Sequence, residues 1–317
     1  MCKRSIMKRK FLSIVLCLSM LLSLLTLASC SDKNDPPAAE TESIAILYEN
    51  DVHCAVDGYS KLATMKAELK REYDHVGVVS SGDFVQGGTL GAVSKGEYII
   101  NLMNKVGYDA IALGNHEFDY QLARLVELNN LSNTKFLSCN FAKVGEDKSY
   151  FDSYTIVSYG DVEIAYIGIT TPSTISSSNP AQFKNEDGEI IYTFNEAEMY
   201  SLVQANIDAA EKAGADYVIA LSHVGYDESD ELFDITDIIE NTDGFDVVLD
   251  AHAHLVIENK TIKDKSGDDV LLSSTGTKFE YIGKLTITED GLDTELIESA
   301  TYEKTDATVD AYLAEIN

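Results

Sequence analysis

Five short apolar runs in this chain end in Asp, Asn or His, and this pattern limits what the chain can fold into. Each run has the length of a buried β-strand, and the polar residues lie at its end or directly after it. In open α/β sheets, sites are built at the carboxyl ends of strands. One polar residue after a strand is usually part of a turn, but five such strand ends in succession predict a hydrolytic centre with two metal ions. The predicted site residues are Asp51, His53, Asp83, Asn115, His116, Asp119, His223, His252 and His254.

The residue types indicate what each side chain could do. Two divalent ions about 3.5–4 Å apart can activate a water between them and clamp the oxygens of a phosphoryl transfer. We expect Asp83 to bridge the ions, because a carboxylate offsets their repulsion and the small Ser81 and Gly82 let the backbone approach. Mixed carboxylate and imidazole ligands suit Zn, Mn or Fe better than Ca or Mg. His116 and Asp119 are three residues apart, so the carboxylate can orient a protonated imidazole that acts as a general acid.

Strand and helix patterns alternate along the chain, and antiparallel strands follow near its end. This order predicts two mixed sheets with helices outside them. A hairpin is expected at 151–170, with its turn at Gly160 and Asp161. The other predicted strands are 44–49, 75–80, 109–114, 135–141, 216–222, 245–250, 269–275 and 280–288, and the predicted helices are 59–74, 95–107, 120–131, 195–213 and 234–242.

The first 29 residues have the pattern of a secretory signal peptide, with basic residues followed by an apolar stretch. A stretch of this length could also nearly span a bilayer as an uncleaved anchor. The letters LASC at 27–30 favour cleavage, because they resemble the bacterial lipobox, in which the Cys (here Cys30) is lipidated and becomes the new N-terminus. Residues 30–42 are polar and contain two prolines, so we expect a flexible tether. The chain would then be exported and lipid-anchored on the outer face of the bacterial cytoplasmic membrane or on the cell surface.

The composition argues against one class of partner. The chain carries 53 acidic and 24 basic residues, for a formal net charge of −29. Binding a nucleic-acid polymer needs basic patches, and none is visible. The acidic excess favours solubility, and bound divalent cations could supply the local positive charge that an anionic substrate needs. With the signal peptide removed and Cys30 lipidated, only Cys54 and Cys139 remain, so at most one disulfide can form.

Together these motifs resemble the calcineurin-like metallophosphoesterases, most closely the N-terminal domain of the bacterial 5′-nucleotidase group. The family pattern D-x-H, G-D, G-N-H-E, H and G-H-x-H occurs here as D-V-H, G-D, G-N-H-E-F-D, S-H and A-H-A-H, over residues 43–290. The resemblance implies a four-layer αββα sandwich of two mixed β-sheets flanked by helices. It assigns one ion to Asp51, His53, Asp83 and His254, the other to Asp83, Asn115, His223 and His252, and the acid role to His116 with Asp119. Asn115 and His116 would also contact the substrate.

The chain departs from the family pattern at three places. Cys54 and Ala251 stand where the family usually has Gly, and neither change removes a ligand. Nucleotidases of this group continue into a C-terminal domain that binds the substrate's base. We expect that domain to be absent here, and a separate domain or partner chain could supply those contacts. The expected organisation is a signal peptide at 1–29, a tether at 30–42, a metallophosphoesterase domain at 43–300, and a linker with the start of a helix at 301–317.

Several activities are compatible with the resemblance. The favoured hypothesis is a 5′-nucleotidase-like phosphoesterase that acts on a nucleotide or a related small phosphoester. Within the same class, the rivals are a 2′,3′-cyclic-nucleotide phosphodiesterase with 3′-nucleotidase activity and a nucleotide-sugar diphosphatase. A non-catalytic lipoprotein that binds a nucleotide or a metal is the alternative from another class. The presence of every ligand and of the His116–Asp119 pair favours catalysis.

Overall fold

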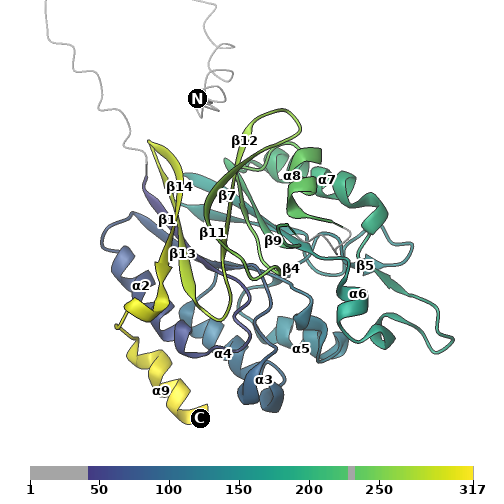
Figure 1. Ribbon diagram of the computed structural model, residues 1–317, viewed down its shortest axis with the longest axis horizontal. Helices are drawn as coiled ribbons and strands as arrows, with labels where there is room; N and C mark the ends of the chain where they lie inside the picture. The colour runs from purple at the N-terminus through teal and green to yellow at the C-terminus, as the bar shows by residue number, and fades with distance from the viewer. Residues whose placement is uncertain (1–41, 228–232, 317) are drawn as a thin grey trace, which may run out of the picture. The chain divides into compact units, whose positions relative to one another are not determined.

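Two six-stranded mixed sheets form the centre of the structure (Figure 1), a computed structural model that describes residues 42–227 and 233–316. The signal peptide, Cys30 and the tether up to residue 41 lie outside the described residues. The first sheet has the order β14 (Gly291–Glu298), β13 (Tyr281–Thr288), β1 (Ile44–Glu49), β2 (His75–Ser80), β3 (Ala110–Ala112) and β4 (Phe136–Leu137). The second has the order β11 (Val256–Lys263), β12 (Asp269–Thr275), β10 (Val247–Leu249), β9 (Tyr217–His223), β7 (Val162–Thr170) and β6 (Tyr154–Tyr159).

Both sheets contain a run of four neighbouring parallel strands. In the first sheet β1, β2, β3 and β4 are parallel, and β13 and β14 continue it in the antiparallel sense. In the second sheet β7, β9, β10 and β12 are parallel, while β6 and β11 are antiparallel edge strands. Because neighbouring parallel strands point the same way, their carboxyl ends collect at one edge of each sheet, where α/β proteins build their sites.

Side chains from the two sheets pack against each other in a shared apolar core. Ile46, Tyr166 and Leu221 belong to this core and are fully buried. A second core lies between the first sheet and helices, and a third lies between the second sheet and other helices. The helices of the second core are α2 (Asp57–Leu69), α4 (Glu97–Val106), α5 (Leu122–Leu131) and α9 (Ala307–Ile316), and those of the third are α7 (Met199–Ala213) and α8 (Ile235–Asn241). The order helix, sheet, sheet, helix confirms the predicted four-layer αββα sandwich.

Shorter elements connect these layers. A two-stranded ribbon pairs β5 (Ala142–Lys143) with β8 (Tyr192–Thr193). The remaining helical elements are α3 (Gly88–Ser94), α6 (Thr174–Ser177), and the 3₁₀ turns η1 (His116–Phe118), η2 (Pro180–Phe183), η3 (Glu196–Glu198) and η4 (Ser299–Thr301). Within residues 301–317, α9 packs onto the helical side of the first sheet through Val309 and Leu313, which are buried.

Most of the predicted elements are present, and several are shorter than predicted, including β3 and β10. The strands β1 and β2 have the predicted bounds, and the hairpin turns between β6 and β7 at the predicted place. The strand expected at 135–141 is wrong in length, because only Phe136–Leu137 pairs with β3. Beyond it the chain leaves the first sheet for the second, and the N–H of Cys139 donates to the carbonyl of Gly168 in β7 at 2.8 Å.

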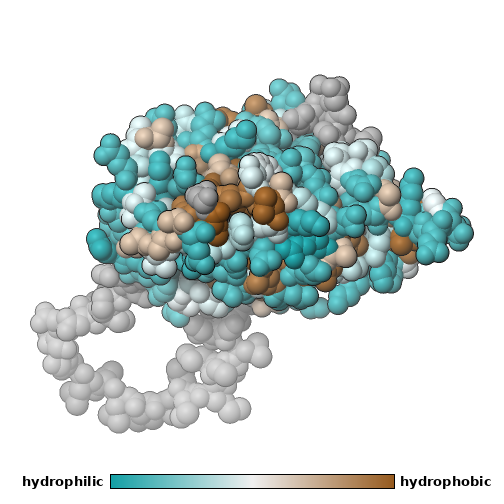
Figure 2. All heavy atoms as spheres, turned by 90° about the horizontal axis from the view of Figure 1, so that it is seen from below, coloured by the Kyte–Doolittle hydropathy of each residue, from teal (hydrophilic) through white to brown (hydrophobic). Residues whose placement is uncertain are grey.

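One face of the molecule shows how polar its surface is. The face in Figure 2 is mostly covered by hydrophilic residues, with a smaller group of hydrophobic ones near its middle.

Cys54 and Cys139 are both free thiols, so the single disulfide that the sequence allows is not formed. In the part of the chain that the structure describes, no helix is both long enough and apolar enough to cross a bilayer.

Candidate metal centre

The nine predicted site residues come together where the carboxyl ends of the two sheets meet. The loops after β1, β2 and β3 supply them from the first sheet, and the end of β9 and the loop after β10 supply them from the second. Six of the nine residues form three overlapping sets in which the possible ligand atoms lie within 4.8 Å of one another. These sets are Asp51 with His53 and His254, His53 with Asp83 and His116, and Asp51 with Asp83 and His223.

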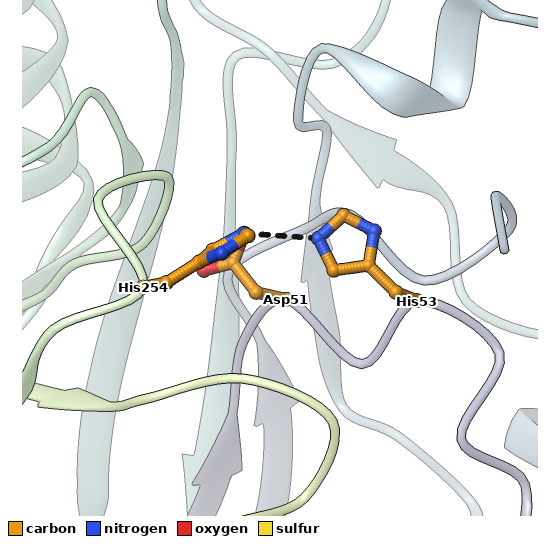
Figure 3. Close-up of side chains that lie close together, drawn as sticks. All are labelled: Asp51, His53 and His254. Carbon is orange, nitrogen blue, oxygen red and sulfur yellow. Dashed lines mark hydrogen bonds and ion pairs between the residues drawn. The ribbon is translucent and has the colours of Figure 1, made fainter.

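Asp51 is the buried carboxylate at one side of the centre. Its Oδ1 lies 3.3 Å from Nε2 of His254 and 3.8 Å from Nε2 of His53, and those two nitrogens are 3.0 Å apart (Figure 3). This Oδ1 atom is buried and accepts no hydrogen bond. By contrast, Oδ2 accepts from the side-chain amide of Asn50 at 2.8 Å and from the backbone N–H of His252 at 3.0 Å. One oxygen is therefore held by the protein, while the other is left for a ligand.

Asp83 lies between the histidines of the two sheets. Its Oδ2 is 3.1 Å from Nε2 of His223 and 3.9 Å from Nε2 of His53. Its Oδ1 accepts the backbone N–H of His116 at 2.8 Å. The side chain of Asp83 is almost fully buried, with a residue exposure of 1%. Contact with nitrogens from both sides is the position expected of a bridging carboxylate.

Asn115 brings a neutral oxygen to the same place. Its Oδ1 lies 3.0 Å from Nδ1 of His252 and 3.2 Å from Nε2 of His223. On the other side of its ring, Nδ1 of His223 donates to the backbone carbonyl of Ser81 at 2.8 Å. Because a carbonyl can only accept, this bond fixes the proton on Nδ1 and leaves Nε2 of a neutral ring as the ligand atom.

Glu117 supports the centre, although it is not among the site residues predicted from the sequence. Its carboxylate is fully buried and accepts four backbone N–H groups. Oε2 takes those of Asp83 at 2.8 Å and Gly114 at 2.7 Å, and Oε1 takes those of Phe84 at 2.8 Å and Val85 at 3.2 Å. One side chain thus joins the loop after β2 to the loop after β3. An acidic residue inside the otherwise ligand-bearing GNHEFD run is the sequence signal that could have pointed to it.

His116 and Asp119 form the predicted pair at the start of a helical turn. Nδ1 of His116 lies 2.6 Å from Oδ2 of Asp119, and both side chains are partly exposed. The hydrogen bond to Asp119 raises the pKa of His116 above its usual value, although burial acts in the opposite direction. The imidazole rings of His116 and His53 are 5.3 Å apart. The pair therefore borders the centre and favours a protonated imidazole.

The backbone is constrained at these loops. Five proposed ligands have positive φ although none is a glycine: Asp51, His53, Asp83, His252 and His254. Non-glycine residues rarely adopt this conformation, and such residues cluster at functional sites. Gly82 also has a positive φ of 98°, and a Cβ there would lie 2.4 Å from the backbone nitrogen of Gly114. This close approach agrees with the expectation that a small residue lets the Asp83 loop reach the centre.

The two departures from the family pattern behave differently. Cys54 has a φ of 60°, so a side chain stands in a conformation that favours glycine. Its Sγ contacts the carbonyl of Val85 at 3.1 Å and belongs to none of the ligand sets among the described residues. Ala251 is buried and is not among the positive-φ residues, so an alanine at this position causes no backbone strain.

The charges at the centre fit bound cations. Burial lowers the pKa of His223, but the carboxylate of Asp83 more than offsets this effect and raises it to about 10. The same imidazole, together with those of His116 and His53, lowers the pKa of Asp83 despite its burial. The buried carboxylates thus favour protonation of the neighbouring imidazoles, and divalent cations could supply the positive charge in place of these protons. The free Oδ1 of Asp51 and the mixed nitrogen and oxygen donors fit a metal of the Zn, Mn or Fe type.

Two stacked mixed sheets with acidic and imidazole side chains at their joined carboxyl ends define a metal-dependent phosphoester hydrolase domain. The chain belongs to the calcineurin-like phosphoesterase family, whose sequence model matches residues 44–256. It is 31% identical over 241 residues to the snake venom 5′-nucleotidase of Gloydius brevicauda, a match that covers 68% of this chain and 38% of that protein. It is also 31% identical over 240 residues to the 5′-nucleotidase of Bos taurus, covering 69% of this chain and 39% of that one.

A solved structure agrees in fold. The 5′-nucleotidase precursor from Thermus thermophilus superposes with a TM-score of 0.71 at 21% identity, covering 86% of this chain and 58% of that one. At this identity the likeness concerns the fold alone. The chain spans less than two fifths of the length of the two curated relatives.

Proposed function

We propose that this chain is a phosphoesterase with two divalent metal ions that hydrolyses nucleotide phosphate esters in the manner of a 5′-nucleotidase. The observation that carries the proposal is the convergence of imidazoles from both sheets on two buried carboxylates, one of which keeps an oxygen without a hydrogen bond. In this proposal Asp51, His53 and His254 would hold one ion, and Asn115, His223 and His252 would hold the other. Asp83 would serve as a ligand for both.

The side chains around the ions would bind the substrate and donate a proton. When bound, the ions supply an activated water and offset the negative charge of the phosphate. Asn115, whose Oδ1 lies near His223, and His116, whose ring lies near that of His53, would contact the phosphate oxygens. Asp119 holds Nδ1 of His116, so that Nε2 is the nitrogen that can give a proton to the leaving alkoxide.

The substrate class is tested by a panel of phosphoesters. The purified chain is loaded with Mn²⁺ or Zn²⁺, its metal content is measured, and phosphate release is followed from 5′-AMP and 3′-AMP. Cleavage of 2′,3′-cyclic AMP and UDP-glucose is followed by separation of the products. We expect about two ions per chain, as a two-metal site requires, and the fastest turnover on the 5′-monophosphate. Faster turnover of the cyclic ester or the nucleotide sugar would replace the 5′-nucleotidase assignment.

The panel also tests whether the chain is an enzyme. p-Nitrophenyl phosphate and its bis ester have a good leaving group and need little recognition of a base. A loaded chain that cleaves neither of these esters but binds a nucleotide would be a non-catalytic binding protein. A chain that cleaves both esters but no nucleotide would keep the metal centre and lose the proposed substrate, which would then depend on a further domain or a partner chain.

We further propose that the protein is exported and held at the membrane by lipid on Cys30. The support is the basic and apolar sequence at 1–29 and the LASC tetrad before the polar stretch. Cys30→Ser should block lipid attachment and stop processing at this position, which a mass spectrum of the membrane-extracted protein detects. Normal processing of the variant, with release of the unaltered protein into the soluble fraction, would contradict the proposal.

A further inference from the structure

Three carboxylates meet at the end of β10 that is remote from the metal centre. Asp243 lies in the loop between α8 and β10, and Asp264 and Asp268 belong to the turn between β11 and β12. One carboxylate oxygen from each lies within 4.8 Å of those from the other two. Two separate segments of the chain therefore bring negative charge to one point.

Asp264 is the buried member of this group. Only 7% of the residue is exposed. Its Oδ1 accepts the backbone N–H groups of Ser266 at 2.9 Å and Asp268 at 2.8 Å, and the hydroxyl of Ser266 at 2.9 Å. Its Oδ2 is also buried but accepts no hydrogen bond. Leaving a buried carboxylate oxygen without a partner is costly, and a cation would remove that cost.

The charge of Asp264 follows from its surroundings. Burial raises the pKa of Asp264, but the backbone N–H of Asp268, the hydroxyl of Ser266 and contact with the carboxyl group of Asp243 outweigh burial and hold it below its usual value. The side chain is therefore ionised at neutral pH, where it lies beside two further carboxylates. Like charges at this separation repel unless something positive lies between them.

We propose that Asp243, Asp264 and Asp268 form a calcium site. All the donors are oxygens, as Ca²⁺ prefers, whereas the metal centre at the other end of β10 mixes nitrogen and oxygen. The hydroxyl of Ser266 lies 3.1 Å from Asp243 and 2.9 Å from Asp264, and it provides a fourth oxygen. No imidazole or thiol belongs to this set of described residues.

The ion would connect two loops of the second sheet. Between the two segments, the backbone N–H of Lys265 donates to the carbonyl of Thr242 at 3.0 Å, and Ser266 donates to Asp243. The segment with Asp243 precedes β10, and the turn with Asp264 and Asp268 follows β11. The loop between β10 and β11 carries His252 and His254. Calcium bound to the folded chain should therefore raise the stability of the sheet that supplies these imidazoles.

Calcium titration of the full chain tests the site. Thermal unfolding is followed at increasing CaCl₂, and binding is measured by calorimetry, for the unaltered protein and for Asp268→Asn. At a hundredfold excess over Kd we expect Tm of the unaltered protein to rise by about 5 °C, and this rise to be lost in the variant. Asp268 is chosen because it is partly exposed, whereas Asp264 organises the turn and its variant could fail to fold.

A neighbouring residue gives the matched control. Asp269 is on the same turn but is exposed and pairs with Lys263. Asp269→Asn should keep the full response to calcium. Calcium bound at the metal centre would act on all three proteins alike, so only the difference between the two variants counts. An equal rise in all three proteins, or no rise in any, would overturn the proposal.

Discussion

The two sheets bring different chemistry to the metal centre. The first sheet supplies the proposed oxygen ligands Asp51, Asp83 and Asn115, together with His53 and the His116–Asp119 pair. The proposed ligands from the second sheet are all imidazoles, on His223, His252 and His254. In this proposal the carboxylate ligands come from the first sheet, and the second sheet would complete the coordination with imidazoles.

The proposed ligands from the two sheets also differ in how firmly the protein holds them in place. Asp51 and Asp83 are almost fully buried, and Glu117 fixes the Asp83 loop through three backbone N–H groups. The imidazoles of the second sheet range from His223, which is fully buried, to His254, whose side chain is 46% exposed. A change at Asp83 in the first sheet should consequently affect both ions, whereas a change at the exposed end of the second sheet should affect one.

Asp83→Asn should have the largest effect, because it keeps the shape of the side chain but removes the charge that offsets two cations. Metal content should fall from two ions per chain, and phosphoesterase activity should fall by at least ~10²-fold. Metal analysis and turnover of 5′-AMP measure the two effects. Asp161→Asn, an exposed change in the β6–β7 turn, is the control. A variant that keeps both ions and near-normal turnover would show that Asp83 is not the bridge.

His116→Asn separates proton donation from metal binding within the first sheet. Metal content should stay near that of the unaltered protein, since the proposed ligands are elsewhere. Turnover of 5′-AMP should fall by about 10²–10⁴-fold, the usual range for general acid–base catalysis. The loss should be much smaller with p-nitrophenyl phosphate, whose leaving group departs without a proton. Equal losses on both esters would instead indicate that His116 binds the phosphate, and loss of metal would make it a ligand.

His254→Asn tests the second sheet at its exposed end. The affinity for one ion should fall by roughly 10–100-fold while the other ion stays bound, and excess metal should restore activity. Metal titration followed by turnover measures both. His75→Asn is the control, because His75 lies outside the centre at the start of β2 and pairs with Glu42. Loss of both ions at once would remove the difference proposed here between the two sheets.

The sequence predicts the central strands better than the edges. β1, β2 and the β6–β7 hairpin are apolar enough to show their period, and the proposed ligands Asp51, His53 and Asp83 follow the ends of β1 and β2. β11 and β14 were not predicted, because these edge strands bury little. In β11 only Ile262 is buried, so no apolar run marks the strand. Tertiary contacts also decide local structure at the end of β4, where the chain leaves one sheet for the other.

Some contacts in the site could not be predicted from the sequence pattern. The types of the proposed ligands and the His116–Asp119 pair can be predicted because each motif consists of residues that are close together in the sequence. The bond from His223 to the carbonyl of Ser81 joins residues far apart in the chain, and it depends on how the two sheets stack. The four bonds to Glu117 likewise need the loops after β2 and β3 to be adjacent. No residue pattern encodes that adjacency by itself.

Asp119→Asn should give the smallest effect and is visible mainly in the pH dependence. The hydrogen bond from His116 to Asp119 is the largest cause of the raised pKa of His116. A general acid must be protonated, so activity on 5′-AMP should be present below this pKa and be lost as the pH rises through it. Without the carboxylate the pKa falls, and the alkaline limb of the kcat/KM profile should move to lower pH. Turnover of p-nitrophenyl phosphate should keep its profile, since its leaving group needs no proton. If the alkaline limb of the 5′-AMP profile stays in place while turnover drops at every pH, Asp119 orients the ring without setting its charge.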